Sequence, residues 1–296
     1  MTTTIDPVDP HLIGIVHDAL RRDLGRTLDA LSLVATALHV PLYEEARALR
    51  QRQHAHDLVR SMAPPLDAGG VPVLLVGGLL DTPWLLEPLA DWFDLLHCRT
   101  ATAPVGFGVD CGERTTGRVL RALEELVHDT GRPALIVAHS RGGQFARAAA
   151  VRRPDLVHAL ITLGSPLNRL LGGAHPLVRA EAVAFGVAGT LGAPGVMRYG
   201  CLHGRCCRTL REDLVRSFPP DVPFLSVFSR TDRVVDWRSC LDPGARHRHV
   251  PTTHVGLLYA FDVLAEELIR LGLAPVPDAR QPADGGPGTL GQDAVA

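Results

Sequence analysis

Short apolar segments alternate with helical segments between residues 71 and 271, and this alternation limits the possible folds more than any other feature. The apolar segments are short enough for strands, and most are apolar on both faces. They span residues 71–76, 133–138, 158–163 and 222–228, with weaker candidates near 95–100 and 247–250. Helical spacing separates them, at about 83–93, 115–129, 142–152 and 255–271. The sequence therefore predicts an α/β fold with a mostly parallel, doubly wound sheet covered by helices on both sides.

Three regions lie outside this alternation. The N-terminal region has the spacing of two helices interrupted near Pro41, and such helices could pack on the core, form a dimer surface or lie on a lipid interface. A Gly-rich region between the third and fourth strong strands has helix-like pieces and predicts a cap or lid, and the Pro- and Gly-rich C-terminus predicts a disordered tail. The expected divisions are an N-terminal helical segment 1–62, a core of 63–165 and 221–272, a cap 166–220 and a tail 273–296.

Ser140 lies in A-H-S-R-G-G, directly after an apolar strand and before a small-residue helix. A nucleophilic serine in this position sits on a tight turn whose neighbours two residues away must be small. Ala138 and Gly142 satisfy that requirement, and Gly143 follows. The alternative is an ordinary turn serine in another kind of α/β protein. Six residues do not decide between the two.

A serine nucleophile needs a base and an acid, which follow it in the order acid, then His, in parallel-sheet enzymes of this type. Asp232 comes four residues after the strand 222–228, and we prefer it to Asp236 because Val234 and Val235 would anchor its loop. His254 lies in a loop before the closing helix. The competing His247 and His249 belong to R-H-R-H, whose alternating charge indicates a solvated strand edge.

Glycines after the first strong strand provide a candidate oxyanion hole. Gly77 and Gly78 would let the backbone approach a substrate carbonyl, with the N–H of Leu79 as one donor and that of Arg141 as the other. The same glycines could simply form a tight strand-to-helix turn that needs positive φ angles.

The segments V-G-G-L-L, A-H-S-R-G-G, T-L-G-S-P, S-R-T-D-R-V-V and T-H-V-G-L-L together resemble an α/β-hydrolase of the lipase and esterase type, over residues 71–271. Ala138 makes the turn similar to the A-x-S-x-G of some bacterial lipases. The resemblance implies a triad of Ser140, Asp232 and His254 that forms an acyl-enzyme without a metal or organic cofactor. Many relatives carry His-Gly where this chain has Gly-Gly, so polar support from that His is absent.

Six cysteines are too few to form a disulfide scaffold in a chain of 296 residues. We expect a disulfide between Cys240 and one cap cysteine, Cys201, Cys206 or Cys207, or a pair between Cys98 and Cys111. The other possibility is that the thiols are free and buried. We expect no zinc site, because the C-x2-C pairs of closed structural sites are missing.

Charge and composition exclude several other functions. The net charge of −2 offers no general attraction to nucleic acid, and all 30 basic residues are Arg, which excludes lysine Schiff-base chemistry. No apolar run is long enough for a transmembrane helix, and the N-terminus lacks a secretory signal, so the expected location is cytoplasmic unless the protein associates with the cell envelope.

The sequence thus predicts a serine hydrolase that cleaves small carboxylic esters with an apolar acyl or alcohol part. Acyl transfer or thioester cleavage would use the same triad, and a non-catalytic α/β-hydrolase scaffold is the alternative from another class. Peripheral lipid contact is compatible with this reading, and the oligomeric state stays open.

Overall fold

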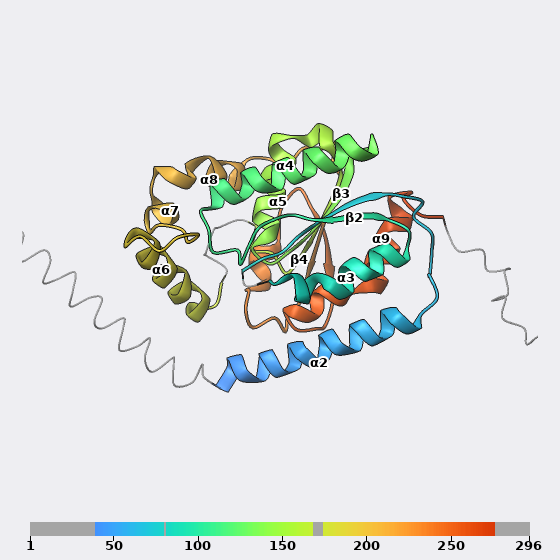
Figure 1. Cartoon of the computed structure of the whole chain (residues 1–296), viewed down its shortest axis with the longest axis horizontal. Helices are drawn as coiled ribbons and strands as arrows, with labels where there is room; N and C mark the ends of the chain where they lie inside the picture. Colours follow the sequence, from blue (N-terminus) through green and yellow to red (C-terminus); the bar gives the residue numbers. More distant parts are fainter. Residues whose placement is uncertain (1–38, 80, 168–173, 276–296) are drawn as a thin grey trace, which may run out of the picture.

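The computed structural model describes residues 39–79, 81–167 and 174–275, and its centre is a six-stranded parallel sheet (Figure 1). The strand order is β2-β1-β3-β4-β5-β6, and every neighbouring pair is parallel. The strands are β1 Pro72–Val76, β2 Arg99–Thr102, β3 Ala134–His139, β4 Val157–Leu163, β5 Phe224–Phe228 and β6 Arg246–His249. The prediction of a parallel, doubly wound sheet is confirmed.

Helices cover both faces of this sheet (Figure 1). On one face, α4 (Gly112–Thr130) and α5 (Gly142–Arg152) bury Leu123 and Phe145. On the other, α3 (Pro83–Leu95) and α9 (Phe261–Arg270) meet through Trp92 and Phe261, whose rings stack 5.2 Å apart. The inner strands β1, β3, β4 and β5 are mostly apolar because both of their faces are buried, whereas the outer strands β2 and β6 are partly or fully exposed.

The described part of the N-terminal segment is one helix, α2 (His39–Ser61), which packs outside α3. Pro41 lies within the described part of this helix, and the first of the two helices expected from the sequence falls outside the described residues. Ala55 and Val59 are buried against the core. This helix therefore docks on the core, while residues 1–38 of the predicted segment lie outside the described residues.

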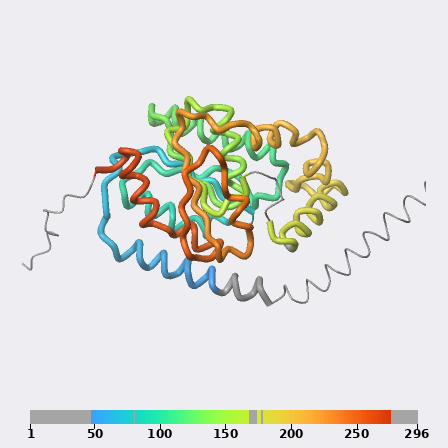
Figure 2. Tube along the Cα trace, turned by 180° about the vertical axis from the view of Figure 1, so that it is seen from behind, coloured from blue at the N-terminus to red at the C-terminus, as the bar shows by residue number. Residues whose placement is uncertain are grey.

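The insertion between β4 and β5 is helical where it is described (Figure 2). It lies beside α4 and α5, and it meets the loop after β5 through an antiparallel bridge between Ala174 and Val235. Its elements are α6 Pro176–Thr190, α7 Gly200–His203, the 3-10 turn η2 Arg205–Cys207 and α8 Arg208–Val215.

The C-terminal part differs from prediction in two details. The helix expected over 255–271 is a 3-10 turn, η4 (Val255–Tyr259), followed by α9, because Ala260 leaves the helical region with ψ 57°. Leu273 donates its N–H to Leu268 O at 2.9 Å and Ala274 is buried, so the core extends past residue 272. The remainder of the predicted tail, 276–296, lies outside the described residues.

The sheet also has a point where the chain changes direction. From β1 the chain moves to β2 on one side and then returns to β3 on the other. In open parallel sheets, ligand sites form at the carboxyl ends of the strands beside such a point. The loops after β1, β3, β5 and β6 all leave the sheet at this edge, and they carry the residues singled out from the sequence.

Candidate active site

Ser140 occupies a strained turn between β3 and α5. Its φ is +52°, a left-handed value that non-glycine residues adopt rarely. Its N–H donates to Leu163 O at 2.9 Å, and Gly143 N–H donates to Ser140 O at 3.1 Å, which ties the turn to β4 and to the start of the helix. Strain of this kind persists where the surroundings over-determine the backbone, commonly at functional sites.

The neighbours of Ser140 are small because other atoms occupy the space. A Cβ atom at Gly142 would lie 2.4 Å from Val76 O, and one at Gly143 would lie 2.2 Å from Ser165 Oγ. Ala138 is fully buried in β3. The steric requirement expected from the sequence is present, and it comes from the close approach of β1 and the loop after β4.

Three side chains from separate loops meet at this turn. Ser140 Oγ lies 2.9 Å from His254 Nε2, and His254 Nδ1 lies 2.7 Å from Asp232 Oδ2. The carboxylate faces Nδ1, so that nitrogen carries the proton and Nε2 is left to accept one from the serine. The order Ser, Asp, His expected from the sequence is therefore matched by hydrogen-bond distances.

Asp232 is fixed by its own loop. Its Oδ1 accepts the backbone N–H groups of Val234 at 2.8 Å and Val235 at 2.9 Å. Burial alone would raise the pKa of Asp232, but the interaction with His254 and these backbone bonds hold the pKa below its ordinary value. The carboxylate is thus held ionised and oriented toward His254.

The competing residues are placed elsewhere. Asp236 caps the 3-10 turn η3 (Trp237–Cys240) by accepting the Arg238 N–H at 3.1 Å, and its side chain is 52% exposed. His247 and His249 lie on β6, the outer strand, where all four residues are exposed. Of the candidate acids and bases, only Asp232 and His254 form the chain of contacts to Ser140.

The loop after β1 lies directly against the serine turn. A Cβ atom at Gly78 would come within 2.7 Å of Ser140 Cβ and 3.0 Å of Arg141 N, so only glycine permits this approach. Gly77 precedes it at the end of β1. Among the described residues, no acceptor takes the backbone N–H of Leu79 or of Arg141. The Arg141 N–H lies at the serine turn itself, and Leu79 directly follows the glycine that packs against Ser140.

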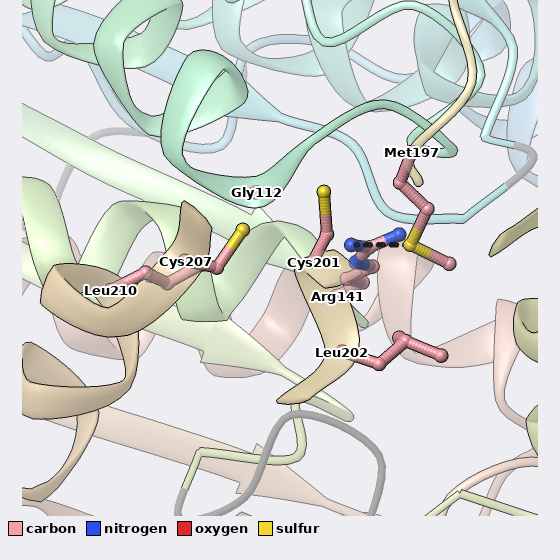
Figure 3. Close-up of a pocket in the computed structure, with 7 residues that line it drawn as sticks. All are labelled: Gly112, Arg141, Met197, Cys201, Leu202, Cys207 and Leu210. Carbon is pink, nitrogen blue, oxygen red and sulfur yellow. Dashed lines mark hydrogen bonds between the residues drawn. The ribbon is translucent and has the colours of Figure 1, made fainter. Parts of the chain in front are cut away.

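The side chain of Arg141 lines a small pocket between the core and the insertion (Figure 3). It donates to Gly108 O at 2.5 Å and approaches Met197 Sδ at 3.9 Å. The pocket is lined by Gly112, Arg141, Met197, Cys201, Leu202, Cys207 and Leu210. One residue thus offers its N–H toward the candidate site and its guanidinium toward the insertion.

Two residues with a place in the site were not singled out as a pair from the sequence. His139 Nδ1 lies 2.7 Å from Asp81 Oδ2, and His139 Nε2 lies 3.1 Å from His254 O. Both ring nitrogens face acceptors, an arrangement that favours the doubly protonated ring. Burial alone would lower the pKa of His139, but Asp81 raises it above the ordinary value, and the pKa of Asp81 is lowered in return. Asp81 Oδ2 also accepts the Gly78 N–H at 2.5 Å. The pair of Asp81 and His139 therefore joins the loop after β1, which we call the glycine loop, to the loop that carries His254, which we call the base loop.

Helix α2 reaches the same base loop from the other side. Gln51 Nε2 donates to Thr252 Oγ1 at 3.3 Å, and Gln51 Oε1 accepts the hydroxyl of Thr253. Thr253 directly precedes His254. The two partners are about 200 positions apart, and nothing in the local sequence around Gln51 indicates the contact.

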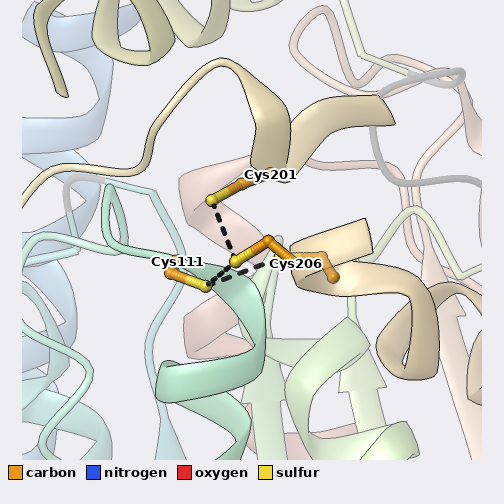
Figure 4. Close-up of side chains that lie close together, drawn as sticks. Cys111, Cys201 and Cys206 are labelled. Atoms are coloured by element: carbon orange, nitrogen blue, oxygen red, sulfur yellow. Dashed lines mark hydrogen bonds between the residues drawn. The ribbon is translucent and has the colours of Figure 1, made fainter. Parts of the chain in front are cut away.

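The cysteines are arranged differently from the expected disulfides. All six are free: Cys240 packs with Phe228 and Val235 at the end of η3, and the cap sulfurs turn toward Cys111 instead (Figure 4). Cys98 and Cys111 pack in separate apolar clusters on opposite faces of the sheet. Neither expected pair forms in this structure: Cys98 and Cys111 lie on opposite faces of the sheet, and Cys240 belongs to a cluster without the cap cysteines.

No helix in the described ranges is long and apolar enough to cross a membrane. No family model matches the sequence.

Several solved structures resemble the fold of this chain. One of a metagenomic carboxyl esterase is 15% identical with a TM-score of 0.50, covering 68% of this chain and 77% of the other. One of the metagenome-derived lipolytic enzymes LipS and LipT is 18% identical with a TM-score of 0.51, covering 70% and 96%.

A Bacillus licheniformis lipase in its mature form is 16% identical, with a TM-score of 0.50, and the match covers 71% of this chain and 94% of the lipase. At such low sequence identities, these similarities concern the fold alone. Together with the strand order and the covered parallel sheet, these similarities show that the chain has the α/β-hydrolase fold.

Proposed function

We propose that the protein is a serine hydrolase that cleaves carboxylic esters. The observation that carries this proposal is the continuous contact from Asp232 through His254 to Ser140, at 2.7 and 2.9 Å, on a turn with a positive φ. An ordinary turn serine requires neither the strain nor the buried acid behind the imidazole. The similarity to carboxyl esterase and lipase structures is compatible with this chemistry.

The mechanism follows from the geometry. His254 Nε2 accepts the proton of Ser140 as Oγ attacks the ester carbonyl, and Asp232 stabilises the resulting imidazolium. The oxyanion is stabilised by the N–H groups of Leu79 and Arg141, each contributing about 3 kcal/mol to lowering the barrier. His254 then protonates the leaving alcohol, and water attacks the acyl-enzyme with His254 as base. All of these groups belong to the chain.

The helical insertion supports an apolar acyl or alcohol part in the substrate. Val183 and Val187 lie one turn apart on α6 and are 42% and 46% exposed, so one face of this helix presents apolar surface to solvent. We propose that the insertion acts as a cap over the apolar part of the ester.

An active-site probe tests the hydrolase proposal. A fluorophosphonate should label the wild-type protein at Ser140, as located by peptide mapping, and should not label Ser140→Ala. The matched control Ser61→Ala removes a serine at the end of α2 and should be labelled like the wild type. Hydrolysis of a p-nitrophenyl ester should fall about a millionfold in Ser140→Ala. A folded wild-type protein that takes no label would overturn the proposal.

An ester panel tests the substrate class. We expect kcat/KM to rise from acetyl toward octanoyl p-nitrophenyl esters, because each buried methylene contributes about 0.8 kcal/mol of transfer free energy. Activity that falls steadily with acyl length would contradict an apolar acyl site.

A further inference from the structure

Four cysteines from two distant parts of the chain gather at the junction between the core and the insertion (Figure 4). Cys111 directly precedes α4, Cys201 lies in α7, and Cys206 and Cys207 end η2 just before α8. The four sulfur atoms lie within 4.8 Å of one another. Cys111 Sγ is 3.3 Å from Cys206 Sγ and 3.6 Å from Cys207 Sγ, and Cys201 Sγ is 3.6 Å from Cys206 Sγ.

These separations fit a tetrahedral metal centre. A zinc ion bound by four thiolates at about 2.3 Å requires neighbouring sulfurs about 3.8 Å apart. The cluster spans this value, from 3.3 Å to at most 4.8 Å. The described residues within that radius contribute sulfur ligands alone, which favours a soft or borderline ion over magnesium or calcium. We propose that Cys111, Cys201, Cys206 and Cys207 form a tetrathiolate zinc site.

The surroundings compensate the negative charge that such a centre carries. Cys111 directly precedes α4, where the helix dipole and the nearby backbone N–H groups of Glu113 and Arg114 favour an anion and lower the pKa of the Cys111 thiol. The half-buried guanidinium of Arg141 lies near Cys111, Cys201 and Cys207, and Figure 3 shows it next to Cys201. Three of the four cysteines are buried and Cys206 is exposed, which leaves a route for the ion to enter.

The site has a structural consequence that is independent of ester hydrolysis. Residues 201–207 belong to the insertion and Cys111 belongs to the core, so the ion would fasten one to the other. The fourth ligand comes from 90 residues earlier in the chain than Cys201, which is why ligand spacing within the insertion gives no sign of it. The site is closed, with four protein ligands and no open position, as structural zinc sites are.

Metal analysis of the full-length protein tests this proposal. Protein purified under reducing conditions without chelators should contain about one zinc per chain, as expected for one closed site. After removal of zinc, Co²⁺ should produce the intense visible bands and the near-ultraviolet thiolate charge-transfer band of tetrahedral sulfur coordination. Zinc absent both as purified and after reconstitution, iron in its place, or a cobalt spectrum without the charge-transfer band would overturn it.

Variants assign the ligands. Cys206→Ser alters the exposed cysteine, so we expect it to fold while losing zinc and the cobalt charge-transfer band. Cys240→Ser, in the separate cluster with Phe228 and Val235, should keep both. If the zinc content of Cys206→Ser is unchanged, Cys206 is not a ligand and the tetrathiolate site is wrong. A Cys111–Cys206 disulfide in non-reducing peptide maps of freshly reduced, anaerobically handled protein would likewise contradict the metal site and show a covalent link in its place.

Discussion

The sheet edge that carries Ser140 and the helical insertion next to it are held together by different forces. The edge is built on strands that are buried on both faces, and its backbone is fixed by close packing of glycines against neighbouring strands. The insertion is attached to the core by apolar side chains, among them Leu202, Leu210 and Leu214, and in addition by buried ionic groups and sulfur atoms. The reacting groups are thus positioned by close backbone packing, while the position of the insertion depends on buried polar contacts as well as on apolar packing.

Arg147 illustrates the second kind of attachment. It projects from α5, is 3% exposed, and donates to Asp242 Oδ2 at 2.7 Å, to Asp213 O at 2.5 Å and to Arg216 O at 2.8 Å. It therefore connects α5 to α8 and to the loop before β6. An apolar residue could fill the space but could not satisfy these oxygens.

The largest effect should come from the rigid edge. Replacing Asp232 by Asn leaves the packing almost unchanged but removes the charge that orients His254, so we expect kcat on a short p-nitrophenyl ester to fall about 10⁴-fold. Asp236→Asn alters only the exposed cap of η3, so its kcat on the same ester should stay within a few-fold of the wild-type value. If Asp236→Asn has the greater effect, the acid has been assigned wrongly.

The next effect concerns attachment of the insertion. Arg147→Met leaves Asp242 buried without its partner, and removing one member of such a pair costs about 3–5 kcal/mol. Urea titration of wild type and Arg147→Met measures this loss as a difference in the free energy of unfolding. The control Arg153→Met breaks the exposed pairs with Glu124 and Asp155 and should barely shift the midpoint. If Arg147→Met and Arg153→Met lose equal free energy of unfolding, burial of the Arg147–Asp242 pair does not determine its contribution to stability.

The smallest effect is a pH dependence at the junction of the glycine loop and the base loop. His139 has a raised pKa, so its contribution to stability is complete below the ordinary value of about 6.5 and is lost as the pH rises through the raised value. Asp81 has a lowered pKa, so its contribution is present above about 3.9 and is lost as the pH falls through the lowered value. The cost of Asp81→Asn should be greatest between these limits.

Urea unfolding of wild type and Asp81→Asn at about pH 5.5, 7.5 and 9.5 measures this cost, which should shrink at the alkaline end. Asp67→Asn alters the exposed Asp67–His97 pair and should show little pH dependence. A constant cost across the series would show that His139 does not change its charge in this range.

The sequence predicts the sheet and the Ser140 turn well because both depend on local patterns. Apolar strand segments, a small residue two positions from the serine, and the order of acid and base are all readable along the chain. The loop of Asp232 was inferred from two valines, and their N–H groups do bind the carboxylate. Whether these residues catalyse ester cleavage stays a prediction that the probe experiment decides.

The contacts that sequence reasoning missed are those between residues far apart in the chain. Asp81 and His139 are 58 positions apart, and Cys111 and Cys206 are 95 positions apart. No periodicity or motif encodes such pairs, because each partner is compatible with its own local structure. The division of the closing helix at Ala260 was missed for a related reason: the residues on either side of the break are all acceptable in a continuous helix.

The exposed outer strand β6 has a consequence for how copies of this protein meet. Its four residues are Arg246, His247, Arg248 and His249, and the two arginines pair with Glu267 and Glu266 of α9. A second strand that approached this edge would have to dehydrate cationic side chains and displace those carboxylates. The sheet is thus protected against extension by another molecule.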